Sequence, residues 1–192
     1  MMDRISICEA LTIRNEIEPF LKRMVTGDEK WTTYDNIVRK RSWSKRSETA
    51  HTVVKLGLTV GNVLLSVWWD YKGIMHYELF LYGQTLNSDL YCQQLDRLKL
   101  AIDQKRPELV NRREIVFYQD NARPHTSIVT RQKLRELGWE VLMHPPYSPD
   151  LAPSDYHLFL SLQNFLDGKK LTSREDCENR LVEFFVNKDQ GF

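Results

Sequence analysis

Two strand-like runs joined by a short turn constrain the fold of this chain more than any other feature of its sequence. Residues 62–69 and 74–81 are dense in β-branched, leucine and aromatic side chains, which favour extended backbone. Between them, Asp70-Tyr71-Lys72-Gly73 has the composition of a hairpin turn. The middle of the chain is therefore predicted to form an antiparallel hairpin.

Periodicity and end signals place further helices and strands on both sides of this hairpin. Helices are predicted from a 3.6-residue spacing of apolar side chains, a cap at Asn87, and stops at Pro107 and Gly138. Because strand–helix–strand units follow the hairpin, we expect an α/β fold: a mixed five-stranded sheet flanked by helices on both faces. The predicted helices are 4–22, 88–105, 127–137, 154–166 and 173–187. The predicted strands are 23–34, 62–69, 74–81, 114–119 and 139–143. The main predicted loops are 35–61 and 144–153.

The composition fits one globular domain over residues 1–192, a length that allows a core of its own. No apolar run is long enough to cross a membrane, and residues 1–6 lack the pattern of a secretory signal. Cys8, Cys92 and Cys177 are odd in number and far apart, so they indicate neither a disulfide framework nor a zinc site. A reducing compartment, cytosol or nucleus, is expected.

A basic stretch lies within the long predicted loop, although the formal net charge is only +1. On a DNA interface its cations would contact phosphates and its indole would stack on a base. A solvated basic loop and a nuclear import signal are alternative interpretations, and the stretch taken alone slightly favours the solvated loop. It holds five cations, one tryptophan and no acid: Arg39, Lys40, Arg41, Trp43, Lys45 and Arg46.

Three aspartates stand where strands end or helices begin. Asp28 lies in the first predicted strand, Asp120 follows the strand 114–119, and Asp155 opens the helix behind the proline-rich loop. Such positions can converge at one edge of a sheet. Each also has an ordinary explanation, as a solvent-facing strand acid, a turn residue and a helix cap. Alternation places Glu29 on the opposite face from Asp28, and Asp150 is expected to shape its loop.

A cluster of three carboxylates would need positive charge to be tolerated. At a separation of ~4 Å each ionised pair costs roughly 4 kcal/mol at an effective dielectric constant of 20. Hard oxygen ligands select Mg²⁺ or Mn²⁺. Two such ions activate a water or a 3′-hydroxyl and stabilise the leaving oxygen in phosphoryl transfer. A metal-dependent nuclease site is therefore one hypothesis for these residues.

Three long blocks of the sequence resemble the signature blocks of mariner-family transposases. They span residues 25–31, 120–125 and 144–157, and 34 residues separate Asp120 from Asp155, which is the mariner spacing. The transposase-derived half of a SET-domain methyltransferase fusion is similar, although this chain contains no SET domain. Blocks of this length in this order are far more specific than one short motif.

The resemblance implies an RNase H-like (retroviral-integrase-like) fold and a DNA transposase activity carried by Asp28, Asp120 and Asp155. It implies two Mg²⁺ ions (Mn²⁺ as a substitute), transposon terminal inverted repeats as substrate, integration at TA and a nuclear location. It implies a homodimer in which the loop 35–61 reaches the partner, which gives the basic stretch a DNA-binding role. Arg123 is an expected phosphate contact. His125 is expected to contact DNA, to orient the metal ligands or to be a structural, hydrogen-bonded histidine, and a structural role is expected for His144.

The sequence departs from the family at its ends. The helix-turn-helix modules that precede the catalytic domain in this family, and its extreme C-terminus, are expected to be absent. Two rival functions stay open: a catalytically silent DNA-binding or dimerisation module, and an unrelated RNase H-like nuclease that cuts RNA–DNA hybrids.

Overall fold

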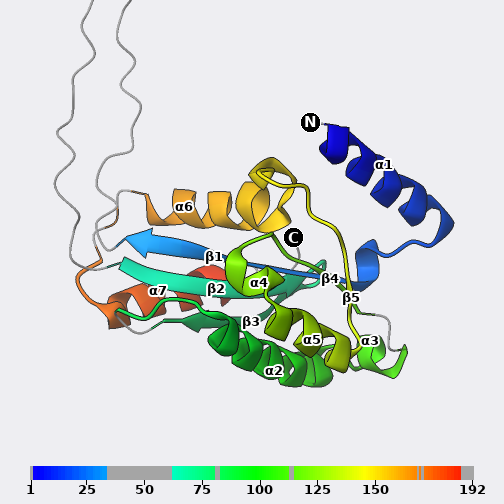
Figure 1. Cartoon of the computed structure of the whole chain (residues 1–192). Coiled ribbons are helices and arrows are strands. Elements are labelled where there is room, and N and C mark those ends of the chain that lie inside the picture. Colours follow the sequence, from blue (N-terminus) through cyan, green and yellow to red (C-terminus); the bar gives the residue numbers. More distant parts are fainter. Residues whose placement is uncertain are drawn as a thin grey trace, which may run out of the picture.

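A mixed five-stranded sheet forms the centre of the protein (Figure 1). The computed structural model describes residues 2–33, 62–80, 83–112, 115–167, 169 and 171–186. The strand order is β3-β2-β1-β4-β5. β1 pairs antiparallel with β2 and parallel with β4, β2 pairs antiparallel with β3, and β4 pairs parallel with β5. The predicted mixed sheet is confirmed, with strands β1 (Met24–Thr33), β2 (Asn62–Asp70), β3 (Gly73–Leu79), β4 (Val116–Tyr118) and β5 (Glu140–Val141).

The predicted hairpin is formed by β2 and β3. Asp70 pairs with Gly73 across the turn, and the Lys72 N–H donates to Asp70 Oδ1 at 2.8 Å. Gly73 has φ 130°, a value that side chains disfavour, so the turn needs glycine there. Asp70 is buried and accepts two hydrogen bonds from the Arg106 guanidinium, at 2.7 and 3.0 Å. This buried ion pair fastens the turn to the end of α2.

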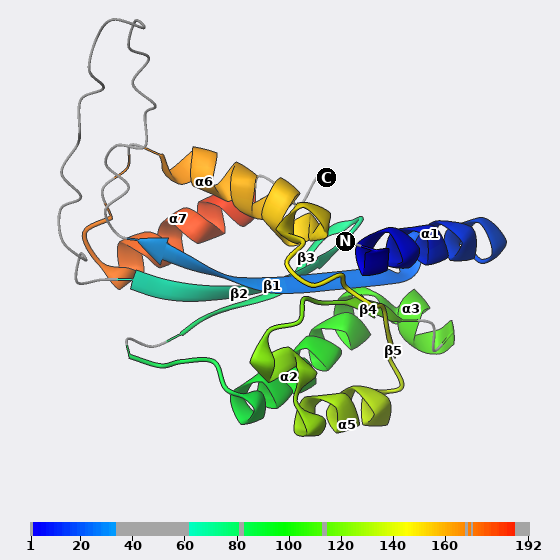
Figure 2. The same cartoon turned by 45° about the horizontal axis from the view of Figure 1, so that its top comes forward.

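Helices cover both faces of the sheet, as the sequence predicted (Figure 2). One face carries α2 (Ser88–Lys105), α3 (Pro107–Arg112), α4 (Arg123–Thr126) and α5 (Ile128–Leu137); below it is called the α2 face. The other carries α6 (Leu160–Leu166) and α7 (Arg174–Val186), and is called the α6 face. α1 (Met2–Ile17) lies beyond one end of the sheet. No helix of the described part of the chain is long and apolar enough to cross a membrane.

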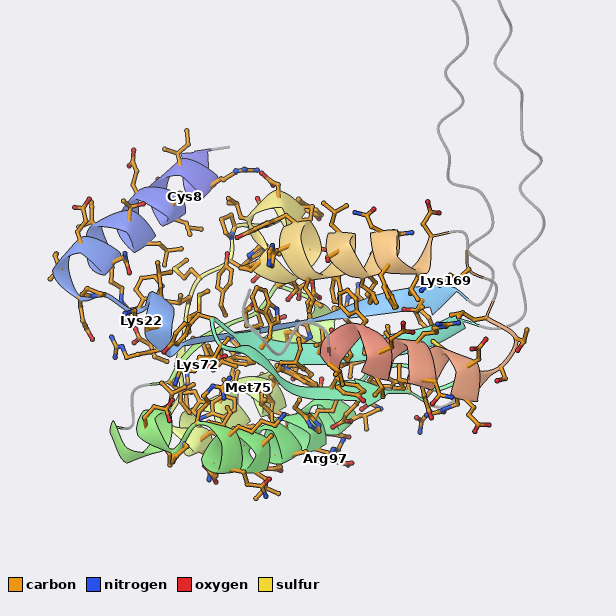
Figure 3. The ribbon with its side chains drawn as sticks, turned by 180° about the vertical axis from the view of Figure 1, so that it is seen from behind. Cys8, Lys22, Lys72, Met75, Arg97 and Lys169 are labelled. Carbon is orange, nitrogen blue, oxygen red and sulfur yellow. The ribbon has the colours of Figure 1, made fainter. Side chains whose placement is uncertain are left out.

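Each face of the sheet has its own buried core, because side chains alternate along β1 and β2. On the α2 face, Trp68 and Val25 pack with side chains of α2, and Met75 extends from β3 toward that helix (Figure 3). On the α6 face, Val67 and Trp69 pack against the last helices. The two tryptophans are therefore both core residues.

Local sequence signals set several element ends correctly. The Asn87 side chain caps α2 by accepting from the Leu90 N–H at 2.9 Å. Ser127 caps α5 in the same way, and Gly138, at φ 72°, ends it. The Asn87 cap and the Gly138 stop were expected from the sequence. The predicted loop 35–61, with its basic stretch, lies outside the described residues.

Other boundaries differ from the prediction. The helix expected over 4–22 ends at Ile17, and a 3-10 turn, η1 (Leu21–Arg23), follows Pro19. Pro107 does not only end α2 but also begins α3, because the first turn of a helix needs no N–H there. β4 and β5 are shorter than expected, since each extends only as far as its neighbour pairs with it.

The proline-rich segment and the helix after it are also more structured than predicted. The 3-10 turn η2 (Pro149–Leu151) lies within the expected loop. The helix expected over 154–166 begins as a π-helix, η3 (Ser154–Phe159), and continues as α6. No proline or cap signal in the sequence distinguishes π from α winding, and π turns are frequent at functional sites.

Candidate active site

The sheet register brings Asp28 and Asp120 to the same level. β1 and β4 are parallel neighbours in which Thr26 pairs with Tyr118, and each aspartate lies two residues further along. A cavity of about 10 Å³ is lined by both Asp28 and Asp120. The adjoining cavity, about 390 Å³ in volume, is lined by Asp120 and Asp155. The three predicted aspartates therefore come from β1, the end of β4 and η3 to two neighbouring cavities, both of which Asp120 lines.

Asp28 and Asp155 are held in surroundings that disfavour their negative charge. Burial, with the nearby charges of Glu29 and Asp120, raises the pKa of Asp28 to about 8, although the Glu29 N–H donates to its Oδ1 at 2.7 Å. Burial also raises the pKa of Asp155, and the charge of Asp120 adds to this while Lys30 opposes it. Both carboxylates would be stabilised by a cation in the cavities.

The surroundings of Asp120, in contrast, favour its negative charge. Burial alone would raise its pKa, but the hydrogen bond and charge of His125, with the Ala122 N–H, lower it. Its Oδ1 accepts from His125 Nδ1 at 2.5 Å and from the Ala122 N–H at 2.9 Å. The side chain is 38% exposed, so an ionised carboxylate faces the cavities.

His125, on α4, is buried between two carboxylates. Its Nδ1 contacts Asp120, and its Nε2 lies 3.0 Å from Glu29 Oε2. The Tyr91 ring packs against it, with centroids 4.3 Å apart. Burial would lower the pKa of His125, but the two carboxylates outweigh this and raise it to about 10. At 1% exposure the ring cannot reach DNA, so the DNA contact predicted for His125 is replaced by a contact with Asp120.

Glu29 is the residue whose role sequence reasoning missed. Alternation correctly placed it on the α2 face, away from Asp28, and it was therefore set aside. The structure shows that α4 brings His125 to that face. The only local signal was a histidine five residues after Asp120, which gives no distance to β1.

The remaining polar residues of the region hold its loops in place. Asn121 donates to the His144 carbonyl at 2.7 Å, and His144 Nδ1 lies 2.8 Å from the Tyr118 hydroxyl, which agrees with the structural role expected for His144. Asp150 pairs with Arg4 of α1, which fits its predicted loop-shaping role. Arg123 is exposed at the start of α4. The residues Arg39, Lys40, Arg41, Trp43, Lys45 and Arg46 lie outside the described residues.

The carboxylate donors fit a hard divalent cation by their chemistry. Two of them carry a charge that burial and neighbouring acids destabilise, and the third is kept ionised. Within the described ranges, no three histidine, cysteine, aspartate or glutamate side chains already surround a common point as metal ligands do. The side chains of this site therefore have to adjust when an ion binds.

Comparison with known proteins places the chain among transposases. A family model described as "Transposase (partial DDE domain)" matches residues 33–112, a range that contains none of the three aspartates. The mariner Mos1 transposase of Drosophila mauritiana is 42% identical over 193 residues, which cover all of this chain and 56% of that protein. The human histone-lysine N-methyltransferase SETMAR is 42% identical over 98% of this chain and 28% of its own length.

Solved structures agree with the sequence comparison. The catalytic domain of Mos1 mariner transposase superposes with a TM-score of 0.82 at 39% identity, over 98% of this chain and 82% of that one. The Mos1 paired end complexes with Mg and with Mn give TM-scores of 0.87 and 0.86 at 42% identity; the alignments cover 99% and 97% of this chain and 56% and 55% of the Mos1 chains. The expected RNase H-like fold is confirmed. The chain spans little more than half of the full Mos1 transposase.

Proposed function

This chain belongs to the mariner family of transposases, and on that premise we propose that it cuts and joins DNA with the help of divalent metal ions. The observation that carries the proposal is the convergence of Asp28, Asp120 and Asp155 on two neighbouring cavities that share Asp120 in their lining. We propose Mg²⁺, replaceable by Mn²⁺, with two ions at the site, because carboxylate oxygens are the ligands these ions prefer. The Mos1 complexes with Mg and with Mn support this choice.

Each aspartate would hold metal from a different setting. When bound, the ions supply an activated water or 3′-hydroxyl and stabilise the oxygen that leaves phosphorus. Asp120 offers a carboxylate that His125 keeps ionised and oriented. Asp28 and Asp155 offer carboxylates whose negative charge a cation would favour, because burial and neighbouring acids raise the pKa of both groups. The burial of Asp28 limits its access to bulk water.

The substrate we propose is transposon-end DNA, cut at terminal inverted repeats and joined at TA, in the nucleus. The pre-cleavage transpososome and paired end complexes of Mos1 support DNA as partner and a homodimer as the working unit. Arg123 is the exposed cation nearest in sequence to Asp120, and we propose it as a phosphate contact. The basic stretch 39–46 and the loop 35–61 are proposed to contact DNA and the partner subunit.

The deciding experiment compares two aspartates five residues apart. Asp155→Ala should abolish nicking of a supercoiled plasmid in Mg²⁺ or Mn²⁺, because one ligand is lost. Asp150→Ala is the matched control: its side chain is exposed and lines neither of the cavities that hold the three aspartates. That variant should nick at the parental rate, since exposed ion pairs contribute about 1 kcal/mol or less. Thermal melting of both variants checks that the fold is intact.

Parental nicking by Asp155→Ala would remove that residue from the site. Titration of Mn²⁺ into the parental protein, followed by calorimetry, addresses the silent-module rival. Heat of binding that disappears in Asp155→Ala supports the proposed function, whereas absence of binding by the parental protein favours a module that only binds DNA. Competition between duplex DNA and an RNA–DNA hybrid in the nicking reaction addresses the other rival.

A further inference from the structure

We propose that Glu29 is a positioning residue which, through the ring of His125, sets the orientation of the Asp120 carboxylate at the candidate metal site. The inference rests on the proposed function, because it gives Asp120 a metal to hold. It assigns a role on the α2 face to a residue that lies one position from Asp28 and faces away from it. Glu29 lines neither of the two cavities that Asp120 shares with the other aspartates, so it would act only through another side chain.

A continuous line of contacts runs from Glu29 to the site. Glu29 Oε2 lies 3.0 Å from His125 Nε2, and His125 Nδ1 lies 2.5 Å from Asp120 Oδ1. On the other side, the Ser66 hydroxyl of β2 contacts Glu29 Oε1 at 3.3 Å. The Glu29 side chain is only 12% exposed. A charge buried to this degree is costly unless it is paired, and His125 is the cation beside it.

The imidazole between these carboxylates has little freedom to turn. The Tyr91 ring packs on it, and the Tyr91 hydroxyl donates to Gln119 Oε1 at 2.6 Å. The Gln119 amide in turn donates to the His125 carbonyl at 3.1 Å. No acceptor in the described residues meets the Nε2 atom in good hydrogen-bond geometry, so the Glu29 carboxylate is its one ionic contact. This nitrogen therefore depends on Glu29.

The ring lies between two carboxylates, with Asp120 at Nδ1 and Glu29 at Nε2. Asp120 Oδ1 is held by the ring and by the Ala122 N–H, and Oδ2 is left for a cation. Without the Glu29 carboxylate the ring loses its contact at Nε2 and can shift or turn relative to Asp120. The hydrogen bond that fixes Asp120 would then weaken. Loss of a partner of this kind typically reduces metal affinity by roughly 10- to 100-fold.

The test removes the charge of Glu29 and keeps its shape. Glu29→Gln should weaken Mn²⁺ binding, measured by calorimetry, by about 10- to 100-fold. The kcat of plasmid nicking should fall while KM for DNA stays unchanged, because no DNA contact is lost. A merely structural role would lower the melting temperature and leave the Mn²⁺ dissociation constant of the folded protein as it was.

Glu78→Gln is the matched control. Glu78 of β3 pairs with Ser66 in the sheet register, as Glu29 does from the other side, and its Oε1 lies 2.7 Å from His76 Nε2. Arg97 of α2, labelled in Figure 3, donates to both of its oxygens at 2.6 and 2.8 Å. None of these contacts is made directly to His125 or to one of the three aspartates; the rings of Trp68 and Tyr91 stand between His76 and His125. The control should therefore lose stability and keep the parental Mn²⁺ affinity.

A metal-free measurement separates failure of this inference from failure of the proposed function. The ring N–H resonances of His125, assigned by nitrogen-15 NMR, should shift in Glu29→Gln and stay in place in Glu78→Gln. Unchanged resonances, or Mn²⁺ binding by Glu29→Gln within twofold of the parental protein, would overturn the positioning role alone. Absence of Mn²⁺ binding by the parental protein would overturn the proposed function, and the positioning role with it. If Glu29→Gln does not fold, Ser66→Ala replaces it, and shifted His125 resonances with weaker Mn²⁺ binding are again required.

Discussion

The α2 face and the α6 face of the sheet prepare the candidate site in different ways. On the α2 face, polar side chains from β1, α2 and α4 form the contacts that hold Asp120. On the α6 face, Asp28 lies next to an apolar core, and Asp155 arrives on the π-helix η3. The pKa of Asp120 is lowered, whereas the pKa values of Asp28 and Asp155 are raised.

Under the proposed function, the difference indicates that one of the proposed ligands is held in place before metal arrives and that the other two are not. A carboxylate that already accepts two hydrogen bonds needs little reorganisation when it binds an ion. Asp28 and Asp155 gain most from the positive charge, so they would supply the response to metal. Three experiments can break or sharpen this comparison.

The largest effect is expected from pH at Asp28, whose pKa moves furthest from its ordinary value among the three aspartates. The folded pKa, about 8, lies above the ordinary value of 3.8, so burial favours the protonated form. In metal-free protein this group therefore contributes stability that is fully present below about pH 4 and is lost as the pH rises through about 8. Urea denaturation across this range should show the decline, and Asp28→Asn should lack it.

Magnesium sharpens the same experiment. Because metal and proton compete for Asp28, the affinity for Mg²⁺ should increase as the pH rises toward 8. Saturating Mg²⁺ should remove much of the decline in stability. A decline of the same size in Asp28→Asn would assign the pH dependence to another group.

The second-largest effect is expected from truncating a buried side chain in the core of the α6 face. Phe159, the last residue of η3, is 2% exposed and packs in the core of the α6 face, and the Lys30 ammonium lies 5.4 Å from its ring centroid. Phe159→Ala should cost about 4 kcal/mol of unfolding free energy, as truncation of a buried phenylalanine usually does. It should also weaken metal binding through Asp155 while the ring resonances of His125 stay unchanged. Shifted His125 resonances would show that the two faces are coupled.

The smallest effect comes from crowding the α2 face. A Cβ added at Gly27 would lie 2.1 Å from Cδ1 of the fully buried Trp68, so the indole would have to move. Gly27→Ala should cost about 2 to 3 kcal/mol in urea denaturation, the usual range for overpacking. Gly83→Ala is the comparison: nothing lies within 4 Å of its added Cβ, and only its φ of 79° opposes the side chain. That variant should lose about 1 kcal/mol, and equal losses in the two variants would contradict the crowding at Trp68.

Local rules predicted the features that depend on a few neighbouring residues. The β2–β3 hairpin, the Asn87 cap, the Gly138 stop and the opposite faces of Asp28 and Glu29 all follow from short-range geometry. The lengths of β4 and β5 depend on pairing with β1, so no pattern inside them predicts where they end. The π winding of η3 and the short helix α4 are likewise set by packing.

The candidate site, like the fold, could be predicted from the sequence only in part. Chemistry explains why three clustered aspartates would need metal, but the resemblance to mariner transposases selected Asp28, Asp120 and Asp155 from the other acids. The burial of His125 and its contact with Glu29 depend on the placement of α4 over β1. That placement is tertiary, and a single sequence carries no distance between those elements.

The winding of η3 constrains the direction in which Asp155 leaves the helix, in addition to the kind of residue that the candidate site needs there. In an α-helix each residue turns the chain by about 100°. Deleting one residue between Asp155 and the buried Leu162, with the winding otherwise unchanged, would turn the aspartate by about that angle relative to the side chains that anchor α6. Changes of length in this turn should therefore matter more than changes of side chain at an exposed position such as Tyr156. The rotational position of Asp155 relative to α6 is therefore a requirement of the candidate site.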